Sequence, residues 1–162
     1  MNYTIEEMKK SDWEEVAKIY FEGINTGIAT FQNSIPTFEE WDNGHVVSCR
    51  LEEKVLGFAA LSPTSSRAVY SGVAEVSIYI GENYRGLGIG QSLLLNLIRL
   101  SEENNFWTLQ SGIIRENAAI IELHKKCGFR EIGIRENVAK MDNGVWHDTV
   151  LMERRSKIVE IN

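Results

Sequence analysis

Three glycines alternate between an apolar, strand-like segment of the chain and its strongest amphipathic helix pattern. They lie in the run Arg85–Gly90, which Gln91 follows. Glycine adopts backbone dihedral angles that other residues avoid, and it lets a ligand approach the main chain closely. The first N–H groups of a helix lack internal partners and lie at the positive end of the helix dipole, so they attract anions. With the charge of Arg85, this turn is a candidate phosphate-binding site.

Two common phosphate-binding motifs do not fit the turn. A Walker loop ends in Gly-Lys-Ser/Thr, whereas this run continues Gly90-Gln91-Ser92. A dinucleotide-binding turn has the spacing G-x-G-x-x-G, and here the third glycine comes one residue early. A strand-to-helix turn that binds no ligand remains the alternative, because glycines alone are weak evidence for a ligand.

A single carboxylate stands in the apolar segment Val73–Ile80. This residue is Glu75, and its neighbours are hydrophobic or small. Desolvation would raise the pKa of such a carboxyl toward the range that suits a general base. Alternate residues of a half-buried strand point to opposite faces, so an exposed Glu75 without a chemical role is the alternative.

The elements that must position these groups follow from hydrophobic periodicity. The sequence predicts an α/β fold, a mixed sheet with helices on both faces, in the order β-α-α-β-β-β-α-β-α-β-β. The expected strands are 2–7, Val46–Glu52, Val55–Leu61, Val73–Ile80, Trp107–Ile114, Phe129–Arg135 and Val145–Met152. Four helices are expected. Three begin after Ser11, Thr37 and Gly90, and the fourth spans about Asn117–Lys126.

Local signals mark the helix ends. Ser11 with Glu14, and Thr37 with Glu40, have the spacing of a capping box at a helix N-terminus. Gly128 is a good residue to follow a helix C-terminus, because it adopts positive φ without steric cost.

Composition limits the function. The 162 residues are the length of one domain, 1–162, with net charge −6 and a pI of about 5.2. An acidic chain disfavours binding to nucleic acid or to an anionic membrane surface. No apolar run approaches ~20 residues, and the N-terminus lacks a signal-peptide pattern, so we expect a cytoplasmic protein. Its 2 cysteines fit neither a disulfide framework nor zinc-ligand spacing, so we expect no metal.

The glycine turn and a second segment together resemble the GNAT acetyltransferase superfamily. The turn is similar to the superfamily's R/Q-x-x-G-x-G/A motif, and Asn117-x6-His124-x3-Gly128-Phe129 is similar to its N-x6-[YH]-x3-G-F segment. The resemblance implies that acetyl-CoA is the ligand of the turn. The cofactor-binding residues that it implies are Ile78, Tyr79, Ile80, Arg85, Gly86, Leu87, Gly88, Ile89, Gly90, Gln91 and Asn117.

Further residues resemble the phosphinothricin N-acetyltransferase branch of that superfamily. They are Phe31, Pro36 and Trp41, the run Arg67-x-x-Tyr70-x4-Glu75-x-Ser77-x-Tyr79, and Gly144–Asp148. The resemblance implies acetylation of the α-amino group of phosphinothricin, methionine sulfoximine or methionine sulfone, and a homodimer. It also implies that amide groups of Ile78–Ile80 are free to bind the acetyl and pantetheine groups.

The resemblance assigns roles to individual residues. Glu75 is the expected general base, acting directly or through water, and His124 is a candidate acid for the departing thiolate. For the acceptor, a guanidinium binds a carboxylate with two parallel hydrogen bonds, so Arg67 is the expected carboxylate partner. Tyr70 would add a hydroxyl donor, Phe31 an apolar contact, and Ser77 a further substrate contact. Two alternatives remain open: another amine acceptor, such as a polyamine, an aminoglycoside or a protein N-terminus, and a non-catalytic module that binds acetyl-CoA.

Overall fold

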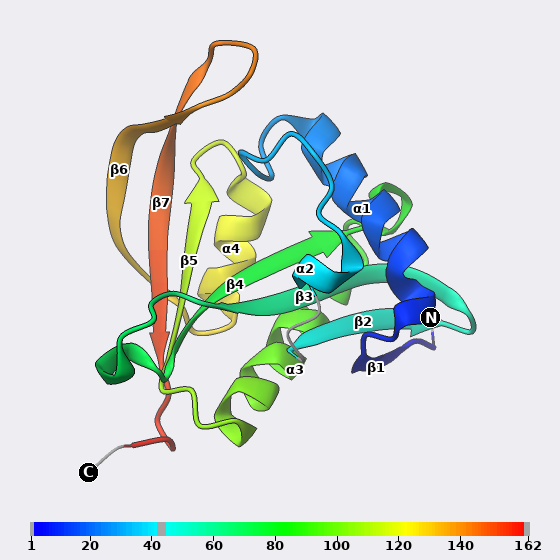
Figure 1. Ribbon diagram of the computed structural model, residues 1–162, viewed down its shortest axis with the longest axis horizontal. Helices are drawn as coiled ribbons and strands as arrows, with labels where there is room; N and C mark the ends of the chain where they lie inside the picture. Colours follow the sequence, from blue (N-terminus) through cyan, green and yellow to red (C-terminus); the bar gives the residue numbers. More distant parts are fainter. Residues whose placement is uncertain (1, 42–44, 161–162) are drawn as a thin grey trace.

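The computed structural model describes residues 2–41 and 45–160 and contains one seven-stranded mixed sheet (Figure 1). The strand order is β1-β2-β3-β4-β5-β7-β6. The strands are β1 (Thr4–Glu7), β2 (Val46–Leu51), β3 (Lys54–Pro63), β4 (Val73–Ile80), β5 (Thr108–Ile114), β6 (Arg130–Lys140) and β7 (Trp146–Arg155). The helices are α1 (Trp13–Thr26), α2 (Phe38–Trp41), α3 (Ile89–Glu103) and α4 (Ala118–Lys126), and short 3-10 turns precede α1, β4 and α3. The predicted fold class and element order are confirmed.

The two faces of the sheet bury separate apolar clusters. Along β3, Phe58 and Ala60 pack in the cluster that includes residues of α1 and α2. Ala59 and Leu61 belong to the cluster that contains the buried leucines of α3. This alternation is the period of two that a strand imposes, and it places the helices on both faces, as the sequence predicts.

Strands β4 and β5 part from each other along their length. They pair in parallel only over Val73–Glu75 and Thr108–Gln110, whereas β4 pairs with β3 over Ala74–Ile80. Figure 1 shows the two arrows diverging toward their C-terminal ends, with α4 near the opening. The C-terminal half of β4 therefore has a strand partner on one side only, and the backbone on the other side is available to a ligand.

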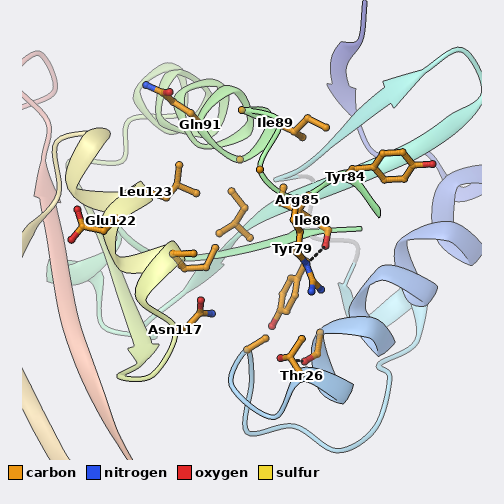
Figure 2. A pocket seen from close by; sticks show the side chains of 18 of the residues that line it. Thr26, Tyr79, Ile80, Tyr84, Arg85, Ile89, Gln91, Asn117, Glu122 and Leu123 are labelled. Carbon is orange, nitrogen blue, oxygen red and sulfur yellow. Dashed lines mark hydrogen bonds between the residues drawn. The ribbon is translucent and has the colours of Figure 1, made fainter. Parts of the chain in front are cut away.

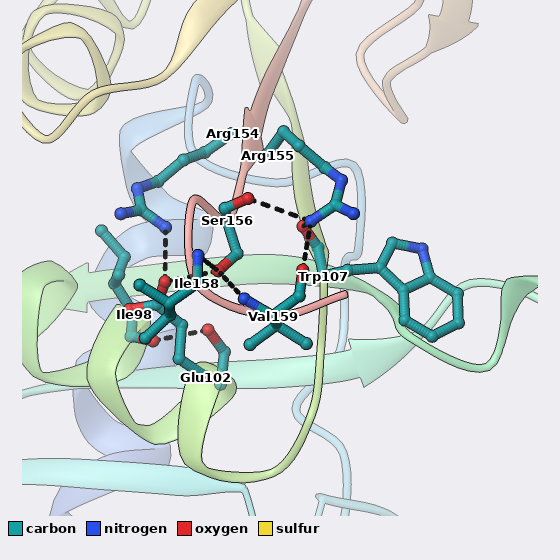
Figure 3. A network of polar contacts seen from close by, with 9 residues as sticks. Ile98, Glu102, Trp107, Arg154, Arg155, Ser156, Ile158 and Val159 are labelled. Atoms are coloured by element: carbon teal, nitrogen blue, oxygen red, sulfur yellow. Dashed lines mark hydrogen bonds and ion pairs between the residues drawn. The ribbon is translucent and has the colours of Figure 1, made fainter. Parts of the chain in front are cut away.

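Hydrogen bonds and an ion pair join the C-terminal end of β7 to α3 and to the start of β5 (Figure 3). Ser156 Oγ lies 2.6 Å from Glu102 Oε2 on α3, and Arg154 forms an ion pair of 3.6 Å with the same carboxylate. Arg155 donates hydrogen bonds to the carbonyl oxygens of Trp107 and Val159 at 3.2 and 2.7 Å. These bonds hold the start of β5 against the end of α3.

Two of the three predicted helix ends are confirmed. Thr37 and Glu40 form a capping box, with backbone N–H to side-chain oxygen distances of 3.4 and 3.2 Å. Gly128 has φ 92° and its N–H donates to Lys125 at 3.1 Å, as expected after a helix C-terminus.

The predicted N-cap at Ser11 is wrong, because Asp12 is the cap of α1. The carboxylate of Asp12 is buried, accepts the N–H of Lys9 at 2.8 Å and pairs with Arg50 at 2.8 Å. A buried carboxylate needs such partners, and the long-range pair with Arg50 fixes where the helix begins.

The last two strands are longer than the hydrophobic pattern indicates. The residues of β6 are mostly exposed, and its pairing with β7 shifts register between Glu131 and Gly133 and between Arg135 and Ala139. An exposed edge strand with bulges has no regular apolar alternation, so periodicity underestimates its length.

Candidate active site

A cavity of about 580 Å³ opens where β4 leaves β5 (Figure 2). Its wall is built from the end of β4, the turn before α3, the first residues of α3, one side of α4 and the end of α1. Ten of the predicted cofactor-binding residues line it: Ile78, Tyr79, Ile80, Arg85, Gly86, Gly88, Ile89, Gly90, Gln91 and Asn117. The eleventh, Leu87, does not line the cavity and is 51% exposed.

The turn before α3 has the geometry of an anion site. Gly86 and Gly88 have φ of 77° and 82°, and a Cβ at either position would meet no atom within 4 Å. Glycine is therefore required there by backbone conformation and not by crowding. The turn leads directly into α3, whose first residues line the cavity and whose first N–H groups lack partners within the helix.

A close approach of two helices completes this end of the cavity. An added Cβ at Gly90 would lie 3.0 Å from the Leu123 side chain of α4, so the absence of a side chain allows α3 and α4 to meet. Arg85 Nε lies 3.4 Å from the Ile80 carbonyl oxygen (Figure 2), and Lys126 brings a second cation to the wall. A helix N-terminus, open glycine backbone and two cations fit an elongated ligand that carries several phosphates, such as acetyl-CoA.

A second cavity of about 240 Å³ lies on the α1 side of the sheet, over β4, β5, β7 and β6. Its lining mixes two charged residues with neutral polar and apolar ones: Glu75, Arg135, Gln110, Ser111, Thr149, Gly112, Phe31, Ile132, Val138, Leu151 and Met152. The predicted residues Glu75 and Phe31 thus meet in one small, mostly uncharged hollow.

Glu75 opens into this second cavity at the last paired position of β4 and β5. Glu75 is exposed as a residue, but partial burial of its carboxylate beside the cavity wall raises the pKa of Glu75, and the nearby positive charge of Arg135 partly opposes this rise. A carboxyl whose pKa lies above its ordinary value is better matched to accept a proton near neutral pH. Further along β4, Tyr79 lines the first cavity, so one strand contributes to both.

Three predicted acceptor-binding residues line neither cavity. Arg67 precedes the 3-10 turn Ala68–Tyr70, and its N–H donates to Ser65 Oγ at 3.1 Å. Tyr70 ends this turn and is 48% exposed. Ser77 lies on β4 between the two cavities. The structure therefore brings Glu75 and Phe31 together and leaves Arg67, Tyr70 and Ser77 outside the walls of both hollows.

His124 is fully buried in α4 and also lines neither cavity. Its ring packs edge-on against Phe129, with centroids 4.8 Å apart. Burial lowers the pKa of His124, and a hydrogen bond to the Ile120 carbonyl only partly opposes this. The His124 side chain is therefore enclosed by protein and does not face either cavity.

Several wall residues were not predicted from the sequence, and two groups of them lie on elements for which no role in the site was expected. The end of α1 lines the first cavity through Gly23 and Thr26, and β6 lines the second through Arg135. Neither group carries a motif, and both reach the site only through tertiary packing. The bulge in β6 determines which side chains of β6 face the second cavity, and the sequence pattern did not indicate that bulge.

In residues 2–41 and 45–160, no cluster of three or more histidine, cysteine or acidic side chains is arranged to hold a metal ion. Within the same described ranges, no helix has the length and hydropathy to cross a membrane.

Comparisons with known proteins agree with this geometry. Residues 5–129 match the model of the Acetyltransferase (GNAT) family. The chain is 32% identical to phosphinothricin N-acetyltransferase of Alcaligenes faecalis, over 93% of this chain and 81% of the relative.

Two solved structures are similar over nearly their whole length. One is a GNAT superfamily phosphinothricin acetyltransferase from Sinorhizobium meliloti in complex with AcCoA, with TM-score 0.86 and 26% identity, covering 99% of this chain and 97% of the other. The other is a ribosomal-protein-alanine N-acetyltransferase from Brucella melitensis, with TM-score 0.88 and 28% identity, covering 94% and 99%.

Proposed function

The chain belongs to the Acetyltransferase (GNAT) family, and from this membership we propose that it acetylates the α-amino group of a small amino-acid-like acceptor. Acetyl-CoA supplies the activated acetyl group, and the chain is an acetyl-CoA-dependent acyltransferase. The observation that carries the proposal is the position of Glu75. This carboxylate opens into the smaller cavity at the point where β4 and β5 begin to part.

Glu75 accepts a proton from the acceptor's ammonium group in the proposed mechanism. An ammonium nitrogen has no lone pair, so it must be deprotonated before it can attack a thioester. The raised pKa of Glu75 makes this carboxylate a stronger base than an ordinary glutamate. The proton moves to a Glu75 oxygen, directly or through one water molecule.

The backbone of β4 positions the acetyl donor. Ile78, Tyr79 and Ile80 line the larger cavity on a stretch of β4 that has no pairing with β5. An N–H group there would donate to the thioester oxygen as negative charge develops on it. The turn at Gly86–Gly90 and Arg85 would hold the pyrophosphate, and Asn117 would contact the pantetheine arm from α4.

A thiol-release screen tests the proposal. Purified full-length protein is mixed with acetyl-CoA and a panel of L-amino acids, methionine sulfone, methionine sulfoximine and phosphinothricin, and free thiol is measured. We expect turnover with at least one amino acid. Glu75→Gln should lower kcat by about 10²- to 10⁴-fold, because a positioned general base contributes that much. The Michaelis constant for acetyl-CoA should stay within twofold.

The structural similarity to a ribosomal-protein-alanine N-acetyltransferase favours a second candidate, an acceptor at a protein N-terminus. A short peptide that begins with alanine therefore joins the panel, together with a polyamine and an aminoglycoside. Preference for any of these over all free amino acids would reject the amino-acid proposal. Tight calorimetric binding of acetyl-CoA without turnover on any acceptor would indicate a non-catalytic module.

A homodimer is also part of the proposal. The edge strand β6 exposes three apolar side chains, Ile132, Ile134 and Val138, and the first residue of β7, Trp146, is exposed as well. Such side chains favour contact with a second surface. Light scattering after gel filtration should give twice the monomer mass of 18.4 kDa.

A further inference from the structure

Two opposite charges face the second cavity, the proposed acceptor site and hereafter the acceptor cavity, from separate strands. Glu75 comes from β4 and Arg135 from β6, with β5 and β7 between them. Glu75 pairs with Gln110 across β4 and β5, and Arg135 pairs with Thr149 across β6 and β7. Paired residues share a face of a sheet, so the carboxylate and the guanidinium lie on the same side, one at each edge of the hollow.

Neither Glu75 nor Arg135 is held in a direct ion pair, although the charge of Arg135 acts on Glu75 from a distance. Among the described residues, Glu75 and Arg135 have no ion-pair partner with nitrogen and oxygen within 4.0 Å, and they do not pair with each other. The other arginine of β6, Arg130, pairs with Glu153 at 3.3 Å. Arg115, at the end of β5, pairs with Asp148 at 2.9 Å. The guanidinium N–H groups of Arg135 are thus available to a ligand, whereas Arg130 and Arg115 are paired with carboxylates.

A bulge fixes the position of Arg135. The pairing of β6 with β7 slips between Arg135 and Ala139. Inside the bulge, the N–H of Asn137 donates to Asp148 Oδ1 at 2.8 Å, and this residue has φ 43°. The second oxygen of Asp148 accepts from Arg115. The bulge is held by specific bonds, which supports a defined orientation for the arginine that precedes it.

We propose that Arg135 binds the α-carboxylate of the acceptor, with the acceptor's amino group at Glu75, and that the site selects amino acids with an uncharged side chain. This rests on the proposed function. A free amino acid carries an ammonium and a carboxylate on one carbon, which matches two separated opposite charges. A guanidinium binds a carboxylate through two parallel hydrogen bonds.

The rest of the cavity explains the preference for an uncharged side chain. Phe31, Leu151 and Met152 offer apolar surface, and Gln110 and Thr149 offer neutral hydrogen-bonding groups. Among the residues that line it, Arg135 is the sole cation. A second anionic group, such as a γ-carboxylate or a phosphinate, would lose water without gaining a positive partner. Methionine sulfone, whose side-chain oxygens are neutral acceptors, fits the lining better.

The experiment compares acceptors and arginine variants in the full-length protein. Initial rates with acetyl-CoA are measured for L-methionine sulfone, its carboxamide, L-glutamate and phosphinothricin. Arg135→Ala should raise KM for methionine sulfone about tenfold or more, since it removes a charge-assisted bidentate bond, and should change KM for the carboxamide much less. Arg135→Lys keeps the charge and loses the bidentate geometry, so its KM for methionine sulfone should lie between those of the wild type and Arg135→Ala. Arg130→Ala, on the same strand, is the control that leaves KM unchanged.

The outcomes separate the two proposals. If the wild-type protein acetylates no free amino acid, the proposed function fails and this inference fails with it. If it acetylates amino acids but Arg135→Ala leaves KM unchanged while Arg67→Ala raises it, only the role of Arg135 is overturned. Preference for phosphinothricin or glutamate over methionine sulfone would overturn the selectivity for uncharged side chains. Thermal unfolding of each variant shows that it is folded, which we expect because Arg135 is exposed.

Discussion

The Nδ1 atom of His124 lies 2.8 Å from the carbonyl oxygen of Ile120. A carbonyl oxygen only accepts hydrogen bonds, so the neutral ring carries its proton on Nδ1. Nε2 is then a lone-pair acceptor, and it is buried without a hydrogen-bond partner among the described residues. Burial also lowers the pKa of His124, so the ring is mostly neutral at pH 7. In this state Nε2 can take up a proton and has none to donate.

The first prediction concerns His124→Phe. We expect kcat to stay within about fivefold of wild type at pH 7.5, because a neutral, buried ring does not supply a proton to the thiolate. A thiol with a pKa near 8.5 is also an acceptable leaving group without an acid. A loss of 10²-fold or more, in a variant that unfolds at the wild-type temperature, would establish His124 as the general acid.

The same histidine makes the stability of the protein depend on pH. Its folded-state pKa is lowered, so the folded state binds fewer protons than the unfolded state as pH falls through the range near 6.5 and below. The stability that depends on a neutral His124 is therefore present above the unfolded pKa and is lost as pH falls toward the folded pKa. The melting temperature of wild type should drop more steeply between pH 7 and pH 5 than that of His124→Phe. Parallel curves would contradict this.

The pH dependence of catalysis should report on Glu75. Because desolvation raises its pKa, the acid limb of kcat/KM should lie above the ordinary glutamate range, near 4.3. The charge of Arg135 opposes that rise, so Arg135→Ala should move the limb to still higher pH. The profile is measured with methionine sulfone carboxamide, whose binding should not depend on the arginine. A limb that moves to lower pH in Arg135→Ala would contradict the assignment.

Gly88 can be tested against a matched glycine remote from the turn before α3. Gly88→Ala and Gly144→Ala both place a Cβ at positive φ, 82° and 85°, where no atom lies within 4 Å. Each should lower the free energy of unfolding by about 1–2 kcal/mol. Only Gly88→Ala should raise KM for acetyl-CoA, because only that turn leads into α3. Equal increases in KM for acetyl-CoA in Gly88→Ala and Gly144→Ala would show that backbone strain, and not a contact of the turn before α3 with acetyl-CoA, causes the increase.

Gly112 lines the second cavity, the proposed acceptor site. An added Cβ would meet only the Leu151 side chain, at an ordinary 3.8 Å, so the fold itself does not require glycine there. Gly112→Ala should therefore leave the melting temperature unchanged or raise it, since glycine weakens a strand. It should raise KM for the acceptor and leave KM for acetyl-CoA unchanged. An unaltered acceptor KM with both Gly112→Ala and Gly112→Val would place the acceptor elsewhere.

The sequence by itself determined the order of the elements and most of the residues that were predicted to bind the cofactor and that line the larger cavity. Those features rest on local chemistry: the glycines before α3, the strand Val73–Ile80 and Gly128 after α4 each carry their signal in neighbouring residues. The single acid of that strand, Glu75, could likewise be found from its apolar surroundings.

Only the tertiary structure decided which residues face Glu75. Arg135 reaches the cavity because β6 is added beyond β7, at the edge of the sheet, and because a bulge sets its register. A slip of one residue moves a side chain to the opposite face, and no local pattern in an exposed edge strand fixes that slip. Arg67, which has the more suggestive spacing in the sequence, lies in the connection between β3 and β4 and does not line the cavity.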